Sequence, residues 1–104
     1  MSSVSKCTDW RAIHNFMPPR PARLRVTGEC TFQTPGFKVT LQKKQPQGIN
    51  PNILLLEKVV QAPTTTEPQV VTTVSAHYVE STDQHYIEVS ILPDNTSIPV
   101  EEVH

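Results

Sequence analysis

Prolines interrupt this chain so often that regular structure must fit into the short segments between them. The 104 residues include ten prolines but only three glycines. Proline lacks the backbone N–H donor, so it is disfavoured in helix interiors and in central strands. Because Thr and Val are common between the prolines, the sequence favours short strands joined by stiff turns. The chain length fits one small domain.

Alternation of apolar and polar residues identifies the first strands. In residues 22–32, the residues from Leu24 to Phe32 at even positions face one way and polar residues face the other, as in a half-buried strand. Residues 37–42 repeat this period of two. Residues 53–60 contain three consecutive leucines, so we expect that strand to be buried on both faces or to bulge near Glu57.

Residues 69–92 contain no proline and are consistent with a hairpin that turns at Thr82-Asp83. This register places Tyr78 opposite Ile87, with the apolar partners sharing one face. It also places His77 on the outer face opposite Glu88, and His85 on the inner face opposite Glu80. The histidines therefore lie on opposite faces.

A second turn at Asp94-Asn95 would pair Ile91 with Ile98 and leave Pro99 facing outward. The last strand is then expected at a sheet edge, where proline is tolerated. The two hairpin registers agree on a shared set of core residues, namely Ile87, Val89 and Ile91.

Together these segments predict an all-β fold, a small antiparallel β-sandwich of about six to seven strands. Its size and strand spacing are similar to those of immunoglobulin-like domains, although no Cys…Trp…Cys pattern is present. Residues 22–104 form the predicted sandwich domain. Residues 1–21 form an N-terminal segment packed at one end, with a short helix capped by Thr8 or Asp9 and then a proline-rich linker.

The two cysteines do not form the framework of several disulfides that small secreted domains commonly carry. Cys30 lies on the apolar face of its strand, which favours a buried cysteine acting as a small hydrophobic residue. A disulfide with Cys7 is the alternative, provided that the N-terminal segment folds back. A reactive thiol is not favoured, because Arg23 and Arg25 point to the opposite face.

No motif indicates catalysis, a cofactor or a metal. The chain has no nucleophile elbow, no glycine-rich phosphate loop and no zinc-type spacing of Cys and His. We therefore predict neither catalytic nor cofactor-binding nor metal-binding residues. The N-terminus has no apolar run that could serve as a signal-peptide core, and no later stretch could span a membrane. A cytoplasmic protein without membrane contact is the expectation.

Charge is distributed unevenly along the chain. Residues 1–50 hold eight Lys and Arg against two Asp and Glu, whereas residues 51–104 hold one against eight. The two halves thus carry about +6 and −7, which the net charge of −1 conceals. Either the charges offset each other inside the fold, or a basic patch remains for an acidic partner or another copy of the chain.

We therefore predict a non-catalytic module for protein–protein interaction or a structural role, with a protein partner or self-association. The alternatives are binding of a small ligand or nucleic acid through the basic face of the first two strands, or an accessory role in an enzyme. Nucleic acid is disfavoured, because the net charge is −1 and no aromatic platform is expected there. The expected interaction face comprises Arg23, Arg25, Lys38, Lys43, Lys44, His77, Tyr86 and Glu88.

Overall fold

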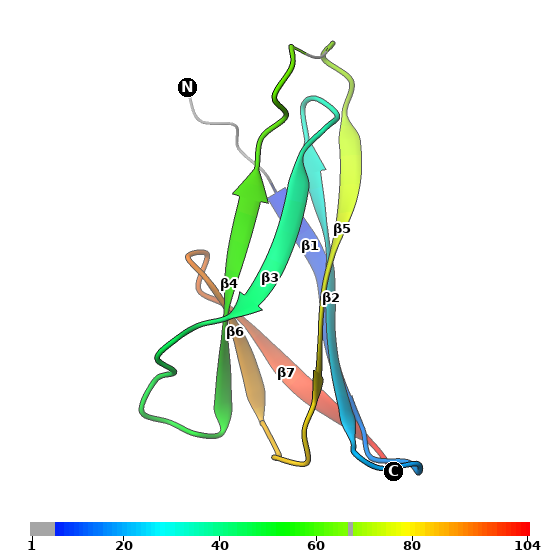
Figure 1. The fold of residues 1–104 in the computed structure, drawn as a ribbon, viewed down its shortest axis with the longest axis vertical. Helices are drawn as coiled ribbons and strands as arrows, with labels where there is room; N and C mark the ends of the chain where they lie inside the picture. The colour runs from blue at the N-terminus through cyan, green and yellow to red at the C-terminus, as the bar shows by residue number, and fades with distance from the viewer. Residues whose placement is uncertain (1–5, 67) are drawn as a thin grey trace.

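The computed structural model describes residues 6–66 and 68–104. In this part of the chain, seven strands form one mixed sheet that curls into a nearly closed barrel (Figure 1). Their order in the sheet is β3-β4-β6-β7-β1-β2-β5. The strands are β1 (Lys6–Asn15), β2 (Arg23–Phe32), β3 (Lys38–Lys43), β4 (Ile53–Gln61), β5 (Thr72–Ser81), β6 (Glu88–Leu92) and β7 (Thr96–Val103).

The all-β prediction is confirmed, but the prediction of two antiparallel sheets is not. Strand β7 links two halves of the sheet, one made of β3, β4 and β6 and the other of β1, β2 and β5. Residues 96–99 pair antiparallel with β6, and residues 100–103 pair parallel with β1. Strand β4 also pairs parallel with β6. The sheet contains parallel pairs because β5 crosses to the other half of the sheet and pairs with β2. When the chain returns as β6, it runs beside β4 and in the same direction as β4.

The predicted N-terminal helix is wrong, because residues 6–15 form strand β1. Ala12, His14 and Phe16 alternate toward the interior, and this period of two prevails over the helical spacing of Trp10 and Ile13. Pairing with β2 on one side and β7 on the other supplies the partners that a strand requires. Residues 1–5 of the predicted N-terminal segment lie outside the described residues.

The inward side chains of both halves form one core, and they include Leu24, Val26, Leu54, Val89 and Ile91. The predicted inward alternation of residues 22–32 is confirmed, since its apolar side chains are buried. The expectation for residues 53–60 is wrong. Leu54 and Leu56 are buried and Leu55 only partly so, with an unbroken register in both neighbouring ladders.

The predicted hairpin of residues 69–92 is wrong, because β5 pairs with β2 over its whole length. The turn that follows is anchored to β2 instead of leading back along β5. Thr82 N–H donates to the carbonyl of Ala22 (2.9 Å), and Ala22 N–H donates to the Asp83 carboxylate (3.1 Å). Ile87, an expected core residue, consequently lies outside the core and is 63% exposed.

The second predicted hairpin is confirmed, with a register shifted by two residues. Val89 lies opposite Ile98, and Pro99 lies opposite Glu88. An even shift keeps every side chain on its predicted face. The expected edge position of β7 is wrong, however, because β7 also pairs with β1; the sheet edges are β3 and β5.

Cys30 is fully buried, as predicted, and it forms a disulfide with Cys7 directly opposite it on β1. The favoured prediction, a free buried cysteine, is therefore wrong, and the disulfide that was the alternative is present because residues 6–15 fold back beside β2. In the described part of the chain, no helix is long and apolar enough to cross a membrane.

Candidate functional site

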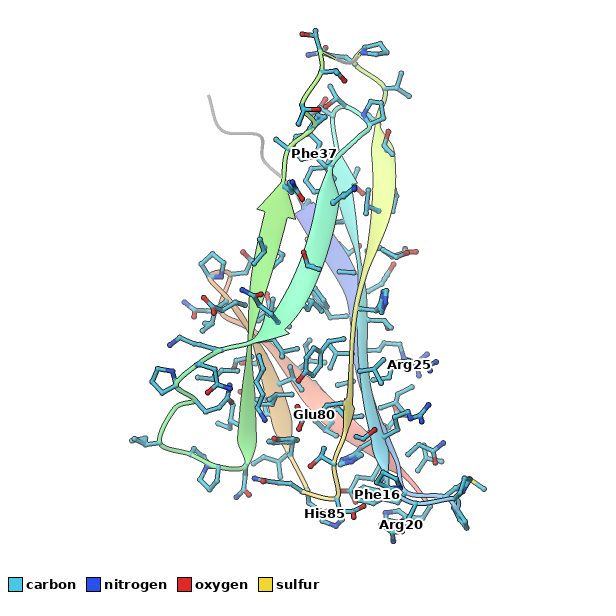
Figure 2. All side chains as sticks on the ribbon, in the orientation of Figure 1. Phe16, Arg20, Arg25, Phe37, Glu80 and His85 are labelled. Carbon is cyan, nitrogen blue, oxygen red and sulfur yellow. A yellow bond between two sulfur atoms is a disulfide. The ribbon has the colours of Figure 1, made fainter. Side chains whose placement is uncertain are left out.

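The outward side of β2 combines charge with exposure. Because side chains alternate along the strand, Arg23, Arg25, Thr27 and Glu29 point away from the core, and we call these four residues the β2 face. Figure 2 shows the Arg25 side chain extending outward from β2. Strands β1 and β5 flank this face on both sides, which gives it width.

Arg25 lies where three surface hollows meet. The largest, about 730 Å³, lies along β2 and β5 and is also lined by Asp9, Glu29 and His77. Two smaller hollows of about 330 and 210 Å³ adjoin Arg23 and Asn15, and the first of them extends to the proline-rich loop of residues 17–21. The β2 face is therefore a hollowed surface, not a flat one.

A β-bulge in β1 brings Asp9 to the largest hollow. Thr8 pairs with Glu29 and Arg11 with Thr27, so Asp9 and Trp10 together oppose Gly28. Asp9 has a φ of 58°, in the left-handed region that Asp tolerates better than most residues. The extra residue sends Asp9 to the outer hollow, while Trp10 packs inward over Gly28. Sequence reasoning missed Asp9, although a glycine inside a strand is a known signal of a bulge.

The charges of the two chain halves partly offset each other across the fold. The ion pairs that Lys and Arg form among the described residues are Arg11–Glu101 (3.8 Å), Arg20–Asp83 (2.9 Å), Lys43–Glu80 (3.6 Å) and Lys58–Asp94 (2.6 Å). The first three join the basic half to the acidic half. Within the described residues, neither Arg23 nor Arg25 has an acidic partner, so the β2 face keeps both positive charges.

The structure brings together only some of the predicted interaction residues. His77 lies beside Thr27 in the β2–β5 ladder and therefore borders the face with Arg23 and Arg25. The other five lie elsewhere. Lys38 points outward from β3, Lys43 pairs with Glu80, Lys44 follows β3, Glu88 lies on β6 and Tyr86 is buried.

The predicted orientations of His85 and Tyr86 are wrong, because β5 and β6 do not pair. His85 is exposed: its ring stacks on Phe16 with centroids 4.4 Å apart, and its Nδ1–H donates to Glu102 Oε2 (2.6 Å). His77 and Glu88 lie in different halves of the sheet and are not opposite each other. Within the described ranges, no group of three or more His, Cys, Asp or Glu is arranged to hold a metal ion.

Glu80 organises a polar cluster where the edge strands β3 and β5 approach each other. The Tyr78 hydroxyl donates to it (2.6 Å), the Lys43 ammonium lies 3.6 Å away, and the Tyr86 hydroxyl donates at 3.4 Å. Burial, and then the Glu80 carboxylate, raise the pKa of both tyrosines, which favours the protonated phenols that donate to Glu80. The Lys43–Glu80 contact ties β3 to β5.

Glu102 is expected to titrate below its ordinary pKa of 4.5, because hydrogen bonds from His85 and His104 favour its charged form. A depressed carboxyl pKa contributes stability above pH 4.5, and this contribution is lost as the pH falls through the lowered value. The measurement is a ¹³C NMR titration of the side-chain carboxyl. Replacing both histidines by alanine, which removes both hydrogen-bond donors, should return the midpoint toward 4.5. An unchanged midpoint in that variant would show that the two histidines are not the cause.

No protein-family model matches this chain, and no curated protein or solved structure matches it either.

Proposed function

We propose that this chain is a non-catalytic interaction module that binds an acidic segment of a partner protein through the β2 face. The observation that carries the proposal is that Arg23 and Arg25 lie on an exposed face without an acidic partner among the described residues. Residues two apart on a strand lie about 7 Å from each other, so the two guanidinium groups can act together. Guanidinium groups bind carboxylates in a bidentate manner.

The surroundings of Arg25 suit a protein partner better than a nucleic acid. Ile13 of β1 and Val79 of β5 flank Arg25 in the sheet, and Val79 is 45% exposed, so apolar contacts are available beside the charge. Protein interfaces enrich arginine in such mixed surroundings. Asp9 and Glu29 adjoin the same surface and would repel a phosphate backbone.

The test compares two charge reversals of equal size. We expect Arg23→Glu/Arg25→Glu to lower the affinity for a fluorescent ten-residue polyglutamate peptide at least tenfold at low salt, measured by anisotropy. The matched control is Lys38→Glu/Lys44→Glu, which changes the net charge equally but lies away from the β2 face. The control should change the affinity less than twofold, and thermal melts should show that both variants fold.

Three outcomes would contradict the proposal. Equal losses in both variants would mean that only net charge matters, because a local contact cannot depend on distant lysines. Absence of peptide binding by the wild-type chain would remove the acidic partner. Tighter binding of a single-stranded oligonucleotide than of the peptide, with the same dependence on Arg23 and Arg25, would favour the nucleic-acid alternative.

A further inference from the structure

The β2 face is positive at one end and negative at the other, and its partner should mirror that order. Resting on the function proposed above, we infer that the partner segment is an extended peptide of mixed charge. Its carboxylates lie over Arg23 and Arg25, and a basic side chain enters the largest hollow beside Asp9 and Glu29.

The first support is the order of charges along the strand. Arg23, Arg25 and Glu29 point to the same side of β2, and the strand rise of about 3.3 Å per residue places Glu29 about 13 Å from Arg25. The bulge in β1 adds the Asp9 carboxylate at the Glu29 end. Neither carboxylate has a basic partner among the described residues. Arg11 of β1, which lies beside Thr27, pairs instead with Glu101 of β7.

The second support is the hollow itself. At about 730 Å³ it has room for a long basic side chain, and its lining supplies two carboxylates together with the hydroxyl groups of Thr27 and Ser75. Gly28 and Ala76, two small residues that face each other in the β2–β5 ladder, also line it. The hollow thus offers acceptors for an ammonium or guanidinium group at its Glu29 end, four residues along β2 from Arg25, which lines the opposite end of the hollow.

The third support is the distance between the two kinds of charge. A single amino acid cannot span about 13 Å, whereas an extended peptide covers that distance in four residues. Each exposed ion pair contributes little to affinity. Opposite charges at the two ends nevertheless fix the register of the bound segment, and they disfavour uniformly acidic competitors.

The experiment uses the full chain and capped seven-residue peptides, with NMR titration of the ¹⁵N-labelled protein. Peptide ESESTSK carries acids at positions 1 and 3 and a lysine at position 7, and ESESTSS and ESESTSE replace that lysine. We expect ESESTSK to bind about three- to fivefold more tightly than ESESTSS, and ESESTSE to bind most weakly. Shift changes should map to β2 and to the neighbouring parts of β1 and β5.

The matched variant is Asp9→Asn/Glu29→Gln, which removes the two negative charges; asparagine also tolerates the left-handed backbone at residue 9. It should bind ESESTSS as the wild type does, but it should lose the preference for ESESTSK. Moving the lysine to position 5, in ESESKSS, should also remove the preference, because that residue would lie over Thr27.

The outcomes separate the two proposals. If all peptides bind alike to the wild type and to Asp9→Asn/Glu29→Gln, while Arg23→Glu/Arg25→Glu still abolishes binding, the mixed-charge segment is overturned and the acidic partner stands. Equal binding of ESESKSS and ESESTSK would overturn the four-residue spacing. If no peptide binds, or if the arginine reversal has no effect, the proposed function itself fails.

Discussion

Replacing Cys7 and Cys30 together by alanine is expected to lower the free energy of unfolding by about 3 kcal/mol. The disulfide joins residues separated by 23 positions, so its loss returns to the unfolded chain the freedom of a loop of that length. It also fastens the start of β1 to β2, at the end of β1 that lies before the bulge. Cys30 is fully buried, so alanine avoids placing an unpaired polar group in the core.

The measurement is urea denaturation of the oxidised protein, of the protein reduced with a dithiol, and of the double-alanine variant. Reduction and substitution should shift the midpoint in the same direction and by similar amounts. If the oxidised and reduced proteins unfolded at the same urea concentration, the disulfide would not constrain the chain as described. Binding of acidic peptides should persist wherever the protein is folded, because Arg23 and Arg25 lie at the other end of β2.

Replacing Gly28 by alanine is expected to cost about 2 kcal/mol of stability, although alanine is otherwise the mildest substitution. A Cβ at residue 28 would lie 2.6 Å from Trp10 Cζ3 and 2.7 Å from Cδ2, well inside van der Waals contact. The bulge holds the indole over this glycine, so the ring must move before the new methyl group can fit.

Gly48→Ala is the matched control, since a Cβ there would meet only the flexible end of Leu55, at 3.2 Å from Cδ1. It should change the free energy of unfolding by less than about 0.5 kcal/mol. Trp10 is the only tryptophan, so its fluorescence reports displacement of the indole directly. Equal melting of both alanine variants, with an unaltered emission spectrum, would show that Trp10 does not pack on Gly28.

Local patterns in the sequence predicted those parts of the fold that depend on nearby residues. The alternation around Leu24 and Val26 fixes which side of β2 is buried, whichever strands lie beside it. The β6–β7 hairpin was also predicted, since its strands are joined by a short turn. Its register was two residues off, an error that leaves Val89 and Ile98 on the correct face.

The remaining pairings could not be predicted, because several partners satisfy the same apolar face. Strand β5 could bury Ala76 and Tyr78 either by pairing with β6 in a hairpin or by pairing with β2, as it does. The alternation of apolar and polar residues along β5 is the same in both arrangements. Residues 6–15 carry apolar side chains at spacings that fit a helix or a strand. Only the presence of β2 and β7 on either side decides for the strand, since hydrogen-bond partners for its backbone come from distant segments.

The candidate site also has a part that the sequence predicts and a part that depends on the tertiary structure. The sequence by itself determined that Arg23 and Arg25 share the outward face of one strand, because alternation is a local property of the backbone. Only the tertiary structure decided that they have no acidic partner in residues 6–66 and 68–104, whereas Arg11, Arg20 and Lys43 do. It also decided that a bulge carries Asp9 to the hollow. Ion pairs and bulges depend on which strands meet and in what register, and distant contacts set both.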